Sequence, residues 1–242
     1  MIQFYAPDIA TTLTLPESDS QHCVRVLRMQ CGDIIEVVDG KGHRYECRIA
    51  DAHPKRTKVE IVRQTEVKPV WTNHITLAVA PTKHNDRMEW MTEKLVEIGI
   101  NRIVPLLCRY SERKEIKTER LVKIAVSAMK QSLKATMPEI SPMTPIADFI
   151  RECADCDCQK VVGYCDADTP RRLFAKEYKP SRDIVILIGP EGDFSPEEIS
   201  AAISAGFVPV TFGDNRLRTE TAAIVACDTC HILNQAYANE TE

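Results

Sequence analysis

The sequence predicts an α/β protein in two parts, a small β-rich domain over residues 1–70 and a larger domain with a parallel sheet over residues 71–242. Short strand-like runs separated by Gly-rich turns fill the first part. In the second part, apolar strand-like runs alternate with amphipathic helical segments. The 242 residues are 44% hydrophobic and 27% charged, which is typical of globular proteins and argues against disorder.

The expected elements of the first part are a short helix and three strands. The helix is expected over 18–28 and the strands over 34–38, 45–49 and 58–62, with a Gly-rich turn at 39–42. Several short strands in about 65 residues predict a small barrel. The polar stretch 64–71, which contains Pro69, is the expected linker.

In the second part, predicted strands alternate with predicted helices, which is typical of a parallel sheet. Strands are expected over 74–79, 103–107, 161–164, 184–188 and 208–212, with helices over 85–98, 118–134, from 196 to about 205, and over 219–238. Ser195, Pro196 and Glu198 form a capping-box pattern, which predicts where the third of these helices begins.

The chain contains ten cysteines. Three of them, Cys153, Cys156 and Cys158, lie close together, with Cys165 nearby, and thiolates so spaced could bind zinc. A second ligand pair at zinc-ribbon spacing is missing, so we expect no metal and reduced thiols. The N-terminus shows no secretory signal, and the longest apolar run is far shorter than the roughly 20 residues of a membrane helix. We therefore expect a cytoplasmic protein with no membrane association.

Charge is distributed unevenly along the chain, although the net charge is only −4. The segment 102–134 holds nine Lys and Arg against three Glu, whereas the region from 183 onward is strongly acidic. A protein that binds phosphates concentrates cations on one face, so the basic segment favours a nucleic-acid partner. Solvated helix faces are the alternative explanation of the same pattern.

Three loops that follow predicted strands have compositions suited to ligand binding, which in parallel sheets occurs at the carboxyl ends of strands. They are Ile188 to Ser195 (IGPEGDFS), Phe212 to Thr221 (FGDNRLRTET) and Tyr164 to Asp168. Glycine in the first loop would let a ligand approach the backbone closely, and a plain turn is the alternative. The phosphate-loop, dinucleotide-binding and serine-nucleophile motifs are missing from the sequence.

The motifs LIGPEGDFSPEEI (187–199) and RLRTETA (216–222) closely resemble those of bacterial 16S ribosomal RNA uridine-N3 methyltransferases of the SPOUT superfamily. The resemblance is collinear over nearly the whole chain. It includes His22, Lys83 and the Ser111-Glu112-Arg113 motif. The sequence departs from the family at Lys134, where arginine is common, and at Thr136, where a second basic residue is frequent.

The resemblance implies an N-terminal PUA-like barrel for RNA docking and a C-terminal SPOUT domain with a deep trefoil knot. It also implies a homodimer that binds S-adenosylmethionine and methylates N3 of one uridine in 16S rRNA of the small ribosomal subunit. The expected cofactor-binding residues are Tyr164, Ile188, Gly189, Gly192, Phe212, Gly213, Leu217 and Thr219. The expected RNA-binding residues are Arg25, Arg28, Lys114, Lys117 and Lys134.

Three residues are the candidates for catalysis. Arg218 or Arg113 could stabilise the anion that develops on the uracil oxygens when N3 loses its proton. Glu191 could accept that proton, or it could instead hydrogen-bond loop amides in a structural role. A β-branched side chain at Gly189 is expected to abolish cofactor binding without disturbing the fold.

Three other functions remain open at this point. The same fold could methylate a different RNA position, although RLRTETA argues against this. The chain could also be a non-catalytic rRNA-binding assembly factor, which the intact loop motifs disfavour. A zinc-ribbon adaptor is the weakest alternative.

Overall fold

The computed structural model describes residues 2–69, 72–164 and 172–241. The chain divides into two compact units. One contains Met1–Val70 and Val126–Met137, and the other contains Trp71–Ala125 and Pro138–Glu242. The segment 126–137, which lies inside the larger predicted domain, therefore groups with the N-terminal unit.

The N-terminal unit contains a four-stranded sheet in the order β1-β2-β3-β4, in which only β1 and β2 are parallel. The strands are β1 (Gln3–Tyr5), β2 (Ile34–Val38), β3 (His43–Asp51) and β4 (Lys58–Glu66). Strand β4 continues to pair with β3 as far as Glu66, opposite His43. The expected linker is therefore partly strand, because backbone pairing overrides its polar sequence.

The expected helix over 18–28 is shorter and of two kinds. Helices α1 (Ile9–Thr12) and α2 (Glu17–Gln21) precede a π-helix over His22–Val26. The helical backbone ends before Arg28, which has a positive φ of 57°. Cys23 from the π-helix lies in the same apolar core as Phe4 and Ile35 from the sheet.

Hydrogen bonds explain why 126–137 belongs to this unit. The Gln3 amide donates to the Lys134 carbonyl over 2.7 Å, and Met137 N donates to Gly40 O over 2.8 Å. The Lys130 ammonium lies 2.6 Å from the Asp19 carboxylate. Helix α4 (Thr118–Gln131) ends three residues earlier than expected.

The C-terminal unit is built on a parallel sheet in the order β10-β12-β9-β11-β5-β6-β7, with β8 paired to β6. Its strands are β5 (Ile75–Val79), β6 (Arg102–Leu107), β7 (Glu139–Ile140), β8 (Thr144–Pro145), β9 (Gln159–Gly163), β10 (Arg172–Leu173), β11 (Ile184–Ile188) and β12 (Val208–Thr211). Every residue of β11 is buried, as expected for a strand between two neighbours with helices on both faces.

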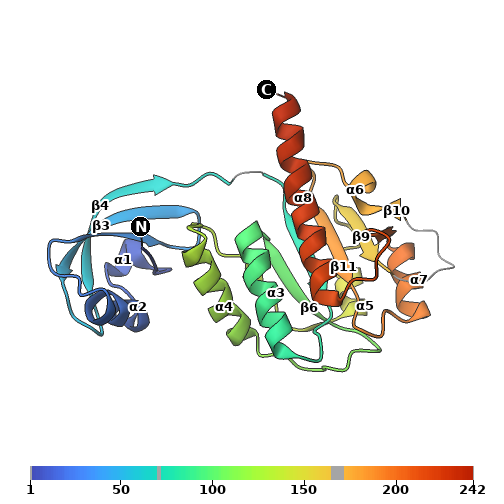
Figure 1. Cartoon of the computed structure of the whole chain (residues 1–242), viewed down its shortest axis with the longest axis horizontal. Helices are drawn as coiled ribbons and strands as arrows, with labels where there is room; N and C mark the ends of the chain where they lie inside the picture. Colours follow the sequence, from blue (N-terminus) through green and yellow to red (C-terminus); the bar gives the residue numbers. More distant parts are fainter. Residues whose placement is uncertain (1, 70–71, 165–171, 242) are drawn as a thin grey trace. The chain divides into compact units, whose positions relative to one another are not determined.

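Helices cover both faces of this sheet (Figure 1). They are α3 (Asn85–Ile98), α5 (Ile146–Glu152), α6 (Phe174–Glu177), α7 (Pro196–Ser204) and α8 (Thr219–Thr241). Helices α3 and α8 pack together, whereas α5 and α7 share an apolar cluster with alternate sheet residues such as Ala78 and Leu187. None of the described helices combines the length and hydrophobicity needed to cross a membrane. The strand order is consistent with the trefoil knot, which stays a prediction.

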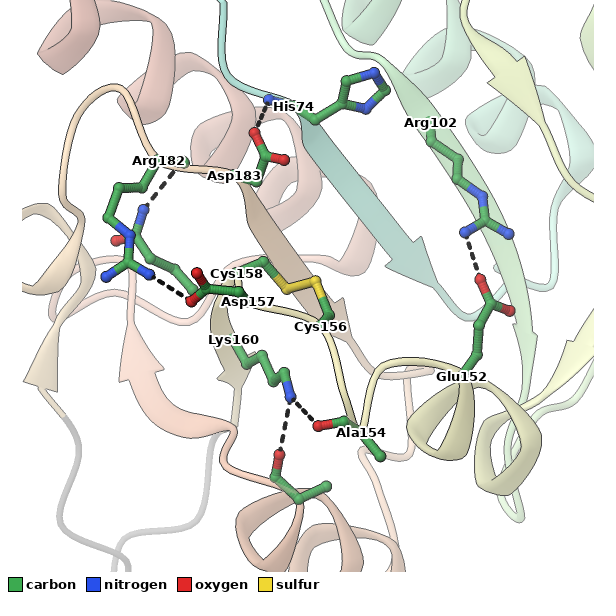
Figure 2. Close-up of a disulfide and its surroundings, with 12 residues drawn as sticks. His74, Arg102, Glu152, Ala154, Cys156, Asp157, Cys158, Lys160, Arg182 and Asp183 are labelled. Carbon is green, nitrogen blue, oxygen red and sulfur yellow. Dashed lines mark hydrogen bonds and ion pairs between the residues drawn. A yellow bond between two sulfur atoms is a disulfide. The ribbon is translucent and has the colours of Figure 1, made fainter.

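The cysteine cluster differs from its expected reduced state, because Cys156 and Cys158 form a disulfide (Figure 2). The single residue between them, Asp157, is exposed, and its carboxylate pairs with Arg182 at 3.0 Å (Figure 2). Cys153 is a free, buried thiol. Cys165 lies outside the described residues, and among the described ones no group of three His, Cys, Asp or Glu side chains could hold a metal.

Candidate active site

The carboxyl ends of β5, β6, β9, β11 and β12 point to one edge of the parallel sheet, and the sequence-predicted loops leave from this edge. At the centre, β11 ends at Ile188 and continues into the buried Gly189 and Pro190. The Ile188 carbonyl accepts from Ala80 N over 3.0 Å, which joins the ends of β11 and β5. Ligands of open α/β sheets bind at such an edge.

The loop after β11 is rigidly held. A Cβ on Gly189 would lie 3.1 Å from the ring of the buried Phe194, closer than most real Cβ contacts. A β-branched side chain there would press on this ring, so the fold is left undisturbed only if Phe194 shifts by a few tenths of an ångström; the expected loss of cofactor binding without loss of the fold stays a prediction. Ser195 and Glu198 form the predicted capping box at the start of α7.

The second loop, after β12, meets the first through one buried hydrogen bond. Thr219 opens helix α8, and its hydroxyl donates to the Gly189 carbonyl over 3.1 Å. Gly213 has a φ of +130°, and the position of a Cβ there is open space. Leu217, which lies between Gly213 and Thr219 in the sequence, is half-buried. The structure thus brings Gly189 and Thr219 together, as the resemblance implies.

Aromatic side chains pack together at the carboxyl ends of β9 and β12. The Phe212 ring contacts the Phe174 ring edge-on at a centroid distance of 5.4 Å. A Cβ on Gly163 at the end of β9 would lie only 2.8 Å from Phe212, so glycine is required for this ring to sit there. Tyr164 N lies 3.5 Å from Val210 O. The rest of the third predicted loop, 165–168, lies outside the described residues.

Glu191 and Arg113 meet at the loop between β5 and α3. The Glu191 carboxylate accepts from Lys83 N over 3.0 Å. The Arg113 guanidinium donates to Lys83 O over 2.7 Å and to Thr82 O over 3.3 Å. Both side chains therefore hold the backbone of one loop, which favours the structural alternative for Glu191. Among the described residues, no hydrogen bond or ion pair joins Arg218 to Glu191 or to Arg113.

Arg218 and Gly192 occupy exposed positions at the same edge. Arg218 directly precedes α8, and its carbonyl accepts from Ala222 N over 2.8 Å. Its side chain is exposed, as is Gly192, where a Cβ would lie 3.2 Å from Cβ of Tyr110. An exposed guanidinium at a helix start is accessible to an anionic or polar ligand.

A buried thiol near the site is not a nucleophile. Burial raises the pKa of Cys108 to about 12, and the Glu198 carboxylate adds to this shift. A thiol with so high a pKa is protonated at neutral pH and unreactive.

The cations of the basic segment are used in several ways. Four of the nine pair with carboxylates: Arg102 with Glu139 and Glu152, Arg109 with Glu197, Arg120 with Glu89, and Lys130 with Asp19. Arg102 begins β6 and so lies at the opposite end of that strand from the site. Lys114 and Lys117 are exposed and form no ion pair with a described residue, and the same holds for Arg25 and Arg28 in the N-terminal unit. The segment is therefore not one uniformly basic face.

Sequence reasoning missed two buried polar groups. Glu220 of RLRTETA is 6% exposed, and its Oε1 lies 3.7 Å from Nε of Arg87 on α3. Asn73, Tyr178 and Asn234 form a buried hydrogen-bond triad, in which the Tyr178 hydroxyl donates to Asn234 over 2.8 Å. Glu220 lies in a motif that the sequence analysis identified, but neither its pairing with Arg87 nor the triad has a local sequence signal, because the partners lie far apart along the chain.

Comparisons with known proteins agree with this architecture. A family model described as an RNA methyltransferase domain matches residues 69–231, and one described as an RNA methyltransferase PUA domain matches residues 15–62. The chain is 30% identical to ribosomal RNA small subunit methyltransferase E of Synechocystis over 222 residues, which cover 90% of this chain and 72% of the relative.

Solved structures are similar over almost the whole chain. A probable rRNA methyltransferase from Porphyromonas gingivalis is 45% identical, with a TM-score of 0.91, covering 98% of this chain and 100% of that one. Ribosomal RNA small subunit methyltransferase E from Neisseria gonorrhoeae, solved with S-adenosylmethionine, is 28% identical with a TM-score of 0.80, covering 96% and 98%. The chain belongs to the family of ribosomal RNA small subunit methyltransferase E, RNA methyltransferases with an N-terminal PUA domain.

Proposed function

We propose that this protein methylates N3 of a uridine in 16S rRNA of the small ribosomal subunit, with S-adenosylmethionine as methyl donor. The observation that carries the proposal is the hydrogen bond between Thr219 and Gly189, which joins both motif loops at the carboxyl edge of the sheet. The names of the relatives support the rRNA substrate, and the bound ligand of the similar Neisseria structure supports the cofactor.

The residues at the edge fit this cofactor. The Cβ space of Gly189 is filled by Phe194, whereas that of Gly213 is open, so a ligand can reach the backbone at Gly213. Backbone groups near Ile188, Gly189, Phe212, Gly213 and Leu217 would hold the adenine, with Tyr164, Gly192 and Thr219 around them. When bound, S-adenosylmethionine would supply the methyl group to uridine N3 and leave as S-adenosylhomocysteine, while the N3 proton would pass to solvent.

The chain would contribute position and positive charge. An exposed cation at Arg218 would stabilise the negative charge that develops on the uracil oxygens. Arg113 would act through the loop between β5 and α3, because its guanidinium donates hydrogen bonds to the Thr82 and Lys83 carbonyls of that loop. Glu191 would be a positioning residue for the same reason, and we do not assign it the proton.

RNA docking would use cations of both units, of which all but the half-buried Lys134 are exposed. Arg25, Arg28 and Lys134 belong to the N-terminal unit, and Lys114 and Lys117 to the C-terminal unit. The PUA family of the N-terminal unit supports this role. Affinity should fall as salt rises, with a slope of roughly 0.7 to 0.9 per phosphate contact. Modification of rRNA would place the protein in the cytoplasm.

We also propose a homodimer. Two apolar side chains on the packed helices α3 and α8 are largely exposed, Trp90 at 49% and Ile232 at 55%. A two-fold interface that covers them would be a closed arrangement. Light scattering at micromolar concentration should give about twice 27.3 kDa, and a mass near 27.3 kDa would contradict the dimer.

The deciding experiment compares rRNA from a strain that has this protein with rRNA from one that lacks it. Mass spectrometry should find one N3-methyluridine in 16S rRNA that disappears in the deletion strain. Loss of a different modification would favour another RNA position. No change, together with no heat on titration of S-adenosylmethionine, would favour a non-catalytic assembly factor.

A further inference from the structure

Three loops of the C-terminal unit meet at Lys83, which lies in the loop between β5 and α3. Its backbone is fixed on both sides, because its N–H donates to Glu191 and its carbonyl accepts from Arg113. The neighbouring Thr82 side chain is buried and donates to His84 O over 3.0 Å. Two hydrogen bonds from neighbouring loops thus hold the backbone of Lys83.

The side chain of Lys83 behaves differently from its backbone. It is 64% exposed, and its ammonium lies 3.0 Å from the Glu112 carboxylate, which is 53% exposed. Exposed pairs of this kind add little to stability, because water screens the attraction. Such a pair can be exchanged for another anion at little cost, while the fixed backbone keeps the ammonium in place.

This ion pair lies on the wall of an open cleft of about 500 Å3. The cleft is lined by Lys83, Glu112, Arg113, Lys114 and Glu115. All five residues come from the loops after β5 and β6, and none from the loops that carry Gly189 or Gly213. Lys114 is exposed and has no ion pair with a described residue, so the cleft offers a second cation to a ligand with repeated negative charges.

We propose that Lys83 binds a backbone phosphate of the RNA substrate and that Glu112 is its internal competitor, which the phosphate displaces. The inference rests on the proposed function and assigns this cleft to the RNA strand. A phosphodiester fits better than the cofactor carboxylate, because the lining residues lie outside the cofactor loops. Glu112 would also disfavour weak, non-specific anions, since an incoming anion must replace it.

The test is a double-mutant cycle on RNA affinity, with a 16S rRNA transcript as probe and no cofactor present. Glu112→Gln should tighten binding about two- to fivefold, because Lys83 no longer has a carboxylate partner. Lys83→Gln should weaken binding about three- to tenfold and lower the salt slope by roughly 0.7 to 0.9. In the Lys83→Gln background, Glu112→Gln should change almost nothing.

Matched controls separate pairing from general charge. Glu115→Gln removes an acid that lines the same cleft and forms no ion pair with Lys83, and it should tighten binding less than Glu112→Gln. Lys176→Gln removes an exposed cation on α6 and should leave RNA affinity nearly unchanged. Thermal melts of every variant should match the wild type, because the altered side chains are exposed.

Several results would overturn the inference. Equal tightening by Glu112→Gln with and without Lys83 would show only a general charge effect. Weaker S-adenosylmethionine binding by Lys83→Gln in calorimetry, with RNA affinity unchanged, would assign the ammonium to the cofactor carboxylate. Variants that all bind RNA like the wild type would refute the inference alone. A wild-type protein that binds neither RNA nor cofactor would refute the proposed function and this inference with it.

Discussion

Replacing Glu191 with glutamine distinguishes a positioning carboxylate from a general base. The structure shows one specific role for this side chain, a 3.0 Å hydrogen bond from Lys83 N. Glutamine keeps an acceptor oxygen at the same place but cannot take a proton. Alanine removes both capacities, so the two variants together separate the roles.

The magnitudes follow from that single bond. A hydrogen bond to a charged acceptor contributes about 1.5 kcal/mol, and a neutral acceptor about half of that. Because about 1.4 kcal/mol corresponds to tenfold in rate, we expect Glu191→Ala to slow methyl transfer about tenfold and Glu191→Gln about threefold. Loss of a general base would instead cost about 10²- to 10⁴-fold in both variants.

The assay is single-turnover methyl transfer from labelled S-adenosylmethionine to 16S rRNA, at saturating concentrations of both. Saturation removes differences in binding, so the rate reports the methyl-transfer step. A loss of a hundredfold or more in Glu191→Gln, with an unchanged thermal melt, would refute the positioning role and identify Glu191 as the proton acceptor.

Three further predictions test other parts of the structure. Thr219→Val should weaken S-adenosylmethionine binding about fivefold in calorimetry, since it removes the bond to Gly189, whereas Thr229→Val on the same helix, whose hydroxyl bonds only within α8, should not. Burial would raise the pKa of Asp39, but hydrogen bonds from the amides of Lys41 and His43 and from the His43 ring outweigh it and lower the pKa. The ionised Asp39 therefore stabilises the fold above pH 3.8, and this stabilisation is lost as the pH falls below that value. Asp39→Ala should lower the free energy of unfolding in urea at pH 7 by about 2–4 kcal/mol. Equal loss of stability in acid for the wild type and the variant would contradict this. Cys156→Ser should lower the free energy of unfolding by at most about 1.6 kcal/mol, because the disulfide closes a very short loop, and a larger loss would show that it organises β9.

The strands and helices that carry strong local signals could be predicted from the sequence. The apolar run of β11 and the capping box of α7 lie where periodicity and cap chemistry put them. The π-helix after α2 could not be foreseen, because no residue pattern distinguishes it from an α-helix. The strand character up to Glu66 could not be foreseen either, because it depends on pairing with the backbone of β3. The grouping of 126–137 with the N-terminal unit has the same cause, since its bonds reach Gln3 and Gly40.

The candidate site was predictable in its loops but not in its contacts. Motifs identified Gly189 and Thr219, yet nothing local shows that one hydrogen bond joins them across 30 residues. The number of charges in the segment 102–134 was the least informative signal, because the sequence does not show which cations form ion pairs with carboxylates. Arg120 pairs with Glu89 and Arg102 with Glu139, whereas Lys114 has no such pair with a described residue. The disulfide at Cys156 also escaped prediction, since short cysteine spacing suits thiols, metals and disulfides alike.

The place of β11 has a consequence for how the chain is made. This strand comes late in the sequence, yet it pairs along its whole length with β5 on one side and β9 on the other. During synthesis, the sides of β5 and β9 that pair with β11 therefore stay unpaired until residue 188 has left the ribosome. Exposed strand edges invite pairing with other chains, and long-range parallel pairing is slow. Nascent chains that stop before β11 should accordingly be the ones that aggregate. The loops at the carboxyl ends of the strands should be among the last parts of the fold to form.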